Sequence, residues 1–277
     1  MGFRIATNVQ SLSAQRTLNG TREAQNRSLE KLSAGERITR AGDDAAGLAI
    51  SEKLKAEIRS MRQANRNAND GISLIQTAEG GLNEIQSILI RLRELSMQSA
   101  SDTVGDVERG FTNKEVQNLV AEVQRISEVT KFNGKSLLNG TLQPMEFQVG
   151  TNNNPTQDRL VYDTRDASST VEKLGLTGLS VSTKVDAQGN LGKIDEAIKT
   201  VNDNRAGFGA LQNRLQSTIN NLMVADENLS AANSRIRDVD VAAESSELTK
   251  RNILMQAGTA MLAQANSNGM MALKLIQ

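Results

Sequence analysis

An apolar residue stands at every seventh position between residues 194 and 236 of the chain. The series is Ile194, Val201, Phe208, Leu215, Leu222, Leu229 and Ile236. A seven-residue period places these side chains on one stripe of an α-helix, and a strict repeat makes that stripe a seam that packs against another helix. At about 1.5 Å per residue the segment would be roughly 64 Å long. It therefore predicts a rod rather than a helix inside a compact globule.

A second stripe with the same period begins near Ala45 and predicts a second long helix. The two helices are expected to pack antiparallel in a coiled-coil rod. The residues assigned to this rod seam are Leu54, Ile58, Met61, Ile72, Ile75, Leu82, Leu215, Leu222, Leu229 and Ile236. Beyond Gly80 and Gly81 the stripe shifts register, which indicates either a coiled-coil stutter or a local kink at the two glycines. A third helix is expected around residues 116–126.

The two ends of the chain also show helical spacing, but their apolar stripes are sparse. Their members are Ile5, Val9, Leu12, Leu29, Leu32, Val241, Leu248, Met255 and Leu262. Ordering the roughly 85 residues of the two ends costs on the order of 100 kcal/mol in backbone entropy. We therefore expect the ends to be largely disordered in a free subunit and to become helical when neighbouring subunits bury these nine residues.

Between about residues 140 and 182 the pattern changes to short alternating runs separated by turn residues. These runs are Met145, Phe147, Val149; Leu160, Tyr162; and Leu179, Val181. They predict a small β-hairpin region, followed by the long helix from Ile194. The expected fold class is mainly α, with a terminal-helix domain of residues 1–44 and 237–277 and a rod domain of residues 45–236.

Composition excludes several classes of function. The 32 basic and 32 acidic residues cancel, which argues against nucleic acid or an anionic membrane as a partner. The chain has no His and no Cys, so the commonest general base, thiol nucleophile and metal ligands are missing. We predict no enzyme activity, no cofactor and no metal.

Two local motifs suggest chemistry but have simpler explanations. Gly134-Lys135-Ser136 resembles the end of a phosphate-binding loop, but Val129 occupies the position that requires glycine. Asp43 and Asp44 could form a carboxylate pair, but the adjacent glycines and the helix that follows favour turn and helix-start roles. Neither motif supports a catalytic site.

Several longer motifs resemble the two terminal signatures of bacterial flagellin. At the amino-terminal side they are Ser33–Ile38, Asp43–Ile50, Arg91–Leu95 and Phe132–Gly134. At the carboxyl-terminal side they are Gly209–Arg214, Ser234–Asp238, Gln256–Gly258 and Leu262–Asn266. The resemblance covers nearly the whole chain, and the motifs occur in the same order as in the family.

The resemblance implies a structural subunit that self-assembles into the flagellar filament for swimming motility. Both termini would form an inner coiled-coil domain, with the rod outside it. The chain would be a short form without the variable outer domains, because it passes almost directly from Leu179 into the descending helix. The family also implies synthesis in the cytoplasm, export of the unfolded chain without a cleaved signal peptide, and polymerisation at the distal tip, so the protein would be extracellular.

Further partners follow from the resemblance alone. They are the flagellar cap and hook-junction proteins, an export chaperone at the C-terminal helix, and the flagellin-sensing Toll-like receptor. Arg91, Leu95 and Glu115 match the rod surface that this receptor engages in recognised members, a surface that also contributes to subunit packing. All three could instead be neutral positions on a helix face, and Leu95 is the one of them most expected to be buried. A coiled-coil module that wraps a partner as a monomer or small oligomer is the alternative, and a hook-junction relative is a third possibility.

Overall fold

The computed structural model of the chain describes residues 7–141, 143–165 and 167–274. Its helices are α1 (Val9–Ala34), α2 (Ala45–Ser99), α3 (Asp106–Val129), α4 (Lys184–Arg237) and α5 (Val241–Lys274). Its short strands are β1 (Lys131–Phe132), β2 (Lys135–Ser136), β3 (Met145–Gln148) and β4 (Arg159–Tyr162). The mainly α fold predicted from the sequence is confirmed.

The chain divides into two compact units. The first is made of residues 1–56 and 227–277, and the second of residues 57–226. Helices α2 and α4 each contribute to both units, because neither helix is interrupted at these divisions. The domain boundaries predicted from the sequence lie ten to twelve residues nearer the chain ends and remain predictions.

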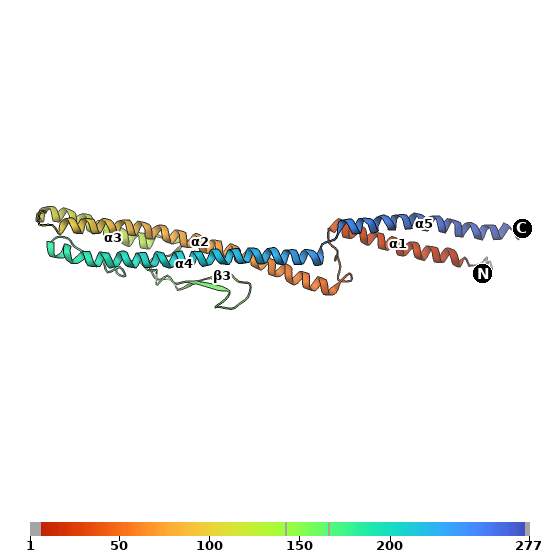
Figure 1. Ribbon diagram of the computed structural model, residues 1–277, viewed down its shortest axis with the longest axis horizontal. Helices are drawn as coiled ribbons and strands as arrows, with labels where there is room; N and C mark the ends of the chain where they lie inside the picture. Colours follow the sequence, from red (N-terminus) through yellow and green to blue (C-terminus); the bar gives the residue numbers. More distant parts are fainter. Residues whose placement is uncertain (1–6, 142, 166, 275–277) are drawn as a thin grey trace. The chain divides into compact units, whose positions relative to one another are not determined.

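In the first unit, α1 and α5 lie side by side and run antiparallel (Figure 1). Asn8 starts α1, since its side-chain Oδ1 accepts a hydrogen bond from the backbone N of Ser11 at 3.0 Å. Gly35 ends α1 with a φ of +71°, a left-handed conformation that favours glycine. The residues that follow α1 pair with the link between α4 and α5 through a bridge between Glu36 and Asp238.

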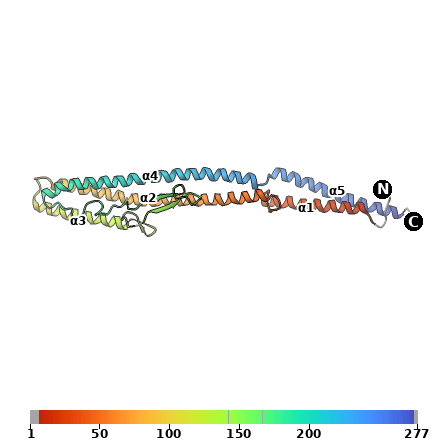
Figure 2. The ribbon, with the colours of Figure 1, turned by 90° about the horizontal axis from the view of Figure 1, so that it is seen from below.

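In the second unit, parts of α2 and α4 lie beside α3, and the hairpins pack along these helices (Figures 1 and 2). The α2 residues in its core recur at intervals of three and four. From Ile75 onward they are Ile75, Ala78, Leu82, Ile85, Leu89 and Leu92. These intervals stay the same across Gly80 and Gly81, so the register shift predicted there does not occur. Helix α2 is continuous through both glycines.

Gly81 allows the end of α3 and the loop after β2 to approach α2 closely. A Cβ atom at this position would lie 2.7 Å from Thr130 Oγ1 and 2.9 Å from Leu138 Cδ1. A Cβ at Gly80 would meet no atom within 4 Å. The glycine pair at which a stutter or a kink was predicted therefore contains one residue that packing requires.

The β-hairpin region is smaller than predicted. β3 and β4 form an antiparallel hairpin, as predicted for this region, with Met145 opposite Tyr162. Leu179 and Val181 are buried but form no strand, because side chains bind their backbone instead of a neighbouring strand. Gln117 Nε2 donates to the Leu179 carbonyl at 2.6 Å, and the Val181 N donates to Asn113 Oδ1 at 3.0 Å.

Helix α4 begins at Lys184, ten residues before the predicted start at Ile194. Thr183 and Asp186 form a reciprocal cap: the Asp186 backbone N donates to Thr183 Oγ1 at 3.1 Å, and Thr183 Oγ1 donates to Asp186 Oδ2 at 2.7 Å. A hydroxyl residue followed three positions later by an acidic residue is a helix-start signal. The heptad pattern begins later in the chain and therefore did not predict this helix start.

Candidate assembly surfaces

Helix α1 turns a mostly small and polar face toward α5. The half-buried or buried positions on this face recur every three or four residues: Ser11, Ala14, Leu18, Thr21, Gln25, Ser28 and Leu32. Ser11 Oγ donates to Asn266 Oδ1 at 2.8 Å, and Gln25 donates to the Asn252 side chain. The α1–α5 seam therefore depends heavily on hydrogen bonds and small side chains.

Helix α5 contributes the larger share of apolar side chains to the same seam. Its half-buried or buried positions include Leu248, Met255, Gly258, Leu262 and Ala265. A Cβ at Gly258 would lie 3.0 Å from Leu18 Cδ1, so the glycine lets the two helices approach closely. Asn8 Nδ2 donates to the Ala265 carbonyl at 2.8 Å and joins the start of α1 to the later part of α5.

Large apolar residues also lie on the outer faces of these two helices. They are Val9, Leu12 and Leu29 on α1, and Val241, Ile253, Leu254 and Met261 on α5. Leu12, for example, is 55% exposed and Met261 64% exposed. Scattered apolar residues are normal on a surface, but here they accompany a unit with almost no core. Within the described residues, its buried hydrophobics are Ile38 and Ala265 alone.

The residues predicted for packing between subunits fall on both faces. Leu32, Leu248, Met255 and Leu262 are half-buried, whereas Val9, Leu12, Leu29 and Val241 are exposed. Ile5 lies outside the described residues. Leu18 on the seam and Ile253, Leu254 and Met261 on the outer face were not among the predicted residues. The available signal was a second apolar stripe on α5, out of phase with the seven-residue series.

Arg237 joins the segments around the start of α2 and the end of α4 in the first unit. Its Nε lies 3.0 Å from Glu36 Oε1, and its Nη1 pairs with Glu52. Hydrogen bonds with Glu52 and Glu36 raise the pKa of the Arg237 guanidinium above its ordinary value. The backbone carbonyl of Arg237 accepts a hydrogen bond from the Arg37 backbone N at 2.6 Å. This network fixes the connections next to the terminal helices.

The predicted rod seam is buried to different depths. Ile58, Ile75, Leu82 and Leu215 are buried. Leu54, Met61, Ile72, Leu222, Leu229 and Ile236 are half-buried. These four buried positions all lie in the second unit. Ile75, Leu82 and Leu215 belong to the core that α2 and α4 share with α3 and the hairpins.

Arg91 and Glu115 form an exposed ion pair across α2 and α3. Arg91 Nη2 lies 3.0 Å from Glu115 Oε1, and Arg91 Nη1 lies 3.1 Å from Glu94 Oε2. Hydrogen bonds with Glu94 and Glu115 raise the pKa of Arg91. Leu95 is only 2% exposed and belongs to the core. The assignment of Leu95 to a surface is therefore corrected, because the α2 stripe that holds Leu92 also turns Leu95 inward.

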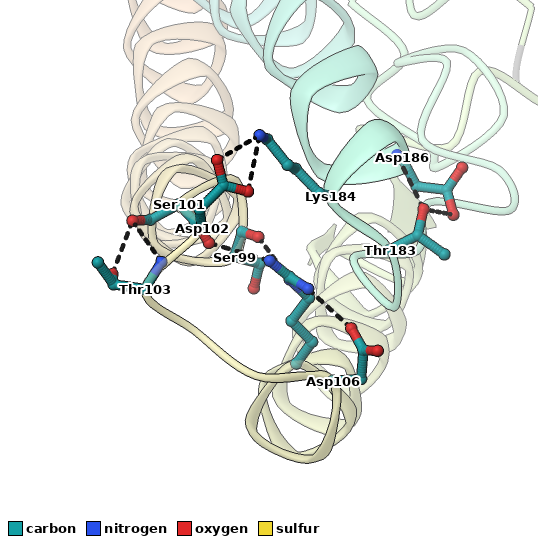
Figure 3. Close-up of polar contacts among 9 residues, drawn as sticks. Ser99, Ser101, Asp102, Thr103, Asp106, Thr183, Lys184 and Asp186 are labelled. Atoms are coloured by element: carbon teal, nitrogen blue, oxygen red, sulfur yellow. Dashed lines mark hydrogen bonds and ion pairs between the residues drawn. The ribbon is translucent and has the colours of Figure 1, made fainter.

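A polar cluster fixes the turn between α2 and α3 (Figure 3). The buried Arg109 donates to the carbonyls of Ser99 and Ser101 at 2.9 and 3.0 Å and pairs with Asp106 at 2.7 Å. Lys184, the first residue of α4, donates to both carboxylate oxygens of Asp102 at 2.7 Å. The Lys184 ammonium lowers the pKa of Asp102 through this hydrogen bond and its charge. The cluster ties the start of α4 to this turn.

Two kinds of site are absent from residues 7–141, 143–165 and 167–274. No helix among them is long and apolar enough to cross a membrane. No group of three or more acidic, His or Cys residues is arranged to hold a metal ion in that part of the chain.

The fold and its surfaces define a class of protein: a helical structural subunit whose two ends pair with little core and carry unburied apolar residues. The bacterial flagellin N-terminal helical region matches residues 5–143, and the bacterial flagellin C-terminal helical region matches residues 191–276. The chain belongs to the bacterial flagellin family. It is a structural filament protein rather than an enzyme, as predicted from the sequence.

Similar proteins agree with this assignment over the full length. A flagellin of Halalkalibacterium halodurans is 46% identical over 273 residues, which cover 99% of each chain. The flagellin of Bacillus subtilis is 41% identical and is covered completely. The flagellar filament 33 kDa core protein of Treponema phagedenis is 43% identical over 99% of each chain. The crystal structure of Bacillus cereus flagellin is 31% identical, has a TM-score of 0.51, and covers 61% of this chain and 94% of its own.

Proposed function

We propose that this chain polymerises into the flagellar filament through α1 and α5, because neighbouring copies bury the outer apolar faces of these helices. One observation about the first unit carries the proposal. This unit has almost no core of its own, yet it exposes large apolar side chains such as Leu12 and Met261. A pair of helices encloses a single seam, so apolar residues outside that seam need further helices to cover them. Copies of the same chain supply such helices in a polymer.

The predicted domains take their roles from this arrangement. Residues 1–44 and 237–277 form the assembly domain, and residues 45–236 form the rod. Within the assembly domain, Val9, Leu12, Leu29 and Val241 pack against neighbouring subunits, since they are exposed in a single chain. Leu32, Leu248, Met255 and Leu262 pack between the chain's own two helices and at the edges of the seam. The same role is proposed for Ile5.

Export precedes assembly in this proposal. The chain is made in the cytoplasm, travels unfolded without a cleaved signal peptide and adds to the distal end of the filament under the flagellar cap protein, beyond the hook-junction proteins. An export chaperone covers the C-terminal helix beforehand. The exposed Ile253, Leu254 and Met261 of α5 support this role, because they are a surface that would otherwise associate prematurely.

Arg91 and Glu115 are proposed as the receptor and subunit-packing surface on the rod. Both side chains are about half exposed, and their ion pair holds them in a defined geometry across two helices. Substituting Arg91→Ala should weaken Toll-like receptor signalling or filament formation with little loss of monomer stability, because exposed ion pairs contribute about 1 kcal/mol or less. Unchanged signalling together with unchanged filaments would remove both roles.

Electron microscopy after salt-induced or seeded polymerisation tests the main proposal. The full chain should form long filaments, whereas a chain trimmed to residues 45–236 should form none. If the trimmed chain polymerises equally well, the terminal helices do not drive assembly. If the full chain stays a discrete monomer or dimer with seeds, the partner-wrapping coiled coil becomes the better function.

Amide hydrogen exchange on the monomer tests how far α1 and α5 depend on neighbours. We expect rapid exchange along both helices in the monomer and strong protection in the filament, because local opening costs little where few apolar contacts must break. Strong protection of both helices in the monomer would show that the α1–α5 pair is stable without a polymer.

A further inference from the structure

One layer of the α1–α5 seam pairs the largest side chain of the α1 face with a glycine of α5. Leu18 is the only large apolar residue among the seam positions of α1 from Ser11 to Ser28. Its Cδ1 atom lies 3.0 Å from the position that a Cβ atom at Gly258 would occupy. At Gly20 of α1, by contrast, a Cβ would meet no atom within 4 Å. Glycine is unfavourable inside a helix, and close packing against α1 gives Gly258 a structural reason.

Hydrogen bonds on both sides of this layer show how the two helices are aligned. Seven residues before Leu18, Ser11 Oγ donates to Asn266 Oδ1 at 2.8 Å. Seven residues after Leu18, Gln25 donates to the side chain of Asn252. Fourteen residues on α1 are thus matched by fourteen residues on α5 in the opposite direction. The Leu18–Gly258 layer lies at the centre of one continuous antiparallel register.

In this register, large side chains face small ones in the neighbouring layers as well. Counting in opposite directions from the Leu18–Gly258 layer places Leu262 opposite Ala14, Met255 opposite Thr21 and Leu248 opposite Ser28. A layer packs well when a large residue meets a small one, and it is overpacked when two large residues meet. The sizes along one helix therefore complement the sizes along the other.

Other alignments of the two helices break this pattern. A shift of three or four residues puts Leu18 opposite Met255 or Leu262, so that two large side chains share one layer. A shift of seven residues keeps the period of the seam but puts Leu18 opposite Ala265 or Arg251. Ala265 would bring a Cβ atom that crowds Leu18. Arg251 would lose the hydrogen bond that it donates to the α1 backbone.

We propose that Leu18 and Gly258 form a register contact, which holds α1 and α5 in the one alignment that can polymerise. The outer apolar faces belong to different helices, with Leu12 on α1 and Met261 on α5. A shift of seven residues would move these faces past each other by about 10 Å, and a neighbouring copy could then not meet both. The proposal rests on the polymerisation proposed above and names what makes every subunit present the same surface.

Disulfide trapping in the full-length monomer measures the register directly, because the chain has no native cysteine. The Ala14→Cys, Leu262→Cys pair reports the observed register, and the Ala14→Cys, Met255→Cys pair reports a shift of seven residues. Copper-catalysed air oxidation removes two electrons and two protons from each thiol pair and passes them to oxygen. In dilute monomer the first pair should close about tenfold faster or more, since the second pair is about 10 Å too far apart. Equal rates would refute a fixed register.

Exchanging the sizes of the two residues tests whether this contact sets the register. Introduced into both cysteine backgrounds, Gly258→Leu should reduce the difference in trapping rate to about twofold or less, because two leucines then meet. Adding Leu18→Ala should restore most of the difference, since the layer again contains one large and one small residue. Gly258→Ala is the milder control, because the end of the Leu18 side chain can move aside for one methyl group. A difference that Gly258→Leu leaves unchanged would overturn the register contact.

Seeded polymerisation of the same full-length variants without cysteines tests what the register does. Sedimentation should give a critical concentration about tenfold higher for Gly258→Leu than for the parent. The Leu18→Ala, Gly258→Leu variant should return to within about threefold of the parent. Circular dichroism should show no loss of helix in Gly258→Leu, because leucine favours a helix more than glycine does. A parental critical concentration for Gly258→Leu would contradict the proposal.

The disulfides also separate register from side-chain effects. Monomers oxidised in the observed register should add to seeds, whereas monomers oxidised in the shifted register should add only after a reducing agent breaks the disulfide. If both oxidised monomers polymerise equally well, polymerisation does not need one register, and the proposal fails while the proposed function stands. A parent that does not polymerise refutes the proposed function instead, and the trapping rates in the monomer then decide separately whether Leu18 and Gly258 set the register.

Discussion

The α1–α5 pair and the bundle of α2, α3 and α4 are both built from long helices, yet they bury their side chains very differently. All but two of the buried hydrophobic residues of the described chain lie in the second unit. There, three helices and two hairpins enclose a continuous core that includes Leu82, Leu89 and Leu92. In the first unit, two helices share one seam whose α1 side contains Ser11, Thr21, Gln25 and Ser28.

This difference separates two tasks within one subunit. We expect the internal burial of the second unit to hold its fold in a single chain. The first unit keeps apolar residues available and fills its seam with groups that form hydrogen bonds, so we expect its stability to depend on what neighbouring copies add. A subunit that must stay unpolymerised before assembly and become rigid afterwards benefits from this division.

The largest expected effect comes from removing a core side chain in the second unit. Leu89→Ala should lower the free energy of unfolding of the monomer by about 3 kcal/mol, within the 2–5 kcal/mol range for buried Leu→Ala changes. Leu12→Ala is the matched change in the first unit and should cost less than about 0.5 kcal/mol in the monomer. Urea unfolding followed by circular dichroism measures both values.

In assembly, Leu12→Ala should have a larger effect than Leu89→Ala, the reverse of their effects on monomer stability. Leu12→Ala should raise the critical concentration for polymerisation, because its side chain is exposed in one chain and buried by neighbours in the filament. If Leu12→Ala destabilises the monomer as much as Leu89→Ala does, the contrast between the two units is not energetic.

The next effect concerns the close approach at Gly81. Gly81→Val should lower the free energy of unfolding by about 1–3 kcal/mol, since its side chain would overlap Thr130 and Leu138. Gly80→Ala is the control and should stabilise the chain by about 0.5–1 kcal/mol, because alanine favours the helix and meets nothing. Thermal unfolding of the two variants gives both shifts. An unchanged stability of Gly81→Val would show that Thr130 and Leu138 move aside easily.

The heptad pattern predicted much of this fold from the sequence, because seven-residue spacing has a single structural meaning over forty residues. The bend between α1 and α2, the β3–β4 hairpin and the antiparallel order were all predictable from turn residues and period. The start of α4 was not found from the heptads, since the core positions of its first turns are Ala187 and Asn190 rather than large apolar residues. The Thr183 and Asp186 cap was the signal available there.

The surfaces were harder to predict than the elements. Helical spacing identifies an apolar stripe but does not say whether the stripe faces the chain's own helix or a neighbour. The stripe through Val9 and Leu12 is exposed, while the less apolar face with Leu18 and Ser28 meets α5. Leu95 is the opposite case. The flagellin resemblance placed it on a surface, but this fold buries it.

A smaller effect tests the polar character of the α1–α5 seam. Ser28 is 1% exposed, and its hydroxyl has no hydrogen-bond partner within the described residues. Ser28→Ala removes a buried unsatisfied group and should stabilise the α1–α5 pair by about 1 kcal/mol. Amide exchange in α1 and α5 of the monomer should slow accordingly. Faster exchange would show that the hydroxyl contributes a favourable contact in the seam.

The smallest effect is the pH dependence of the Asp102–Lys184 pair. Pairing lowers the folded-state pKa of Asp102, so the unfolded chain binds its proton more readily than the folded chain does. The pair therefore stabilises the fold at pH values above the ordinary aspartate pKa, and this contribution is lost as the pH falls through the lowered pKa. Asp102→Asn should melt slightly below the parent near about pH 7 and converge with it near about pH 2. In a Lys184→Met background, the proteins with Asp102 and with Asp102→Asn should have the same melting temperature at each pH. A difference in melting temperature that persists in this background would assign the pH dependence to another partner of the Asp102 carboxylate.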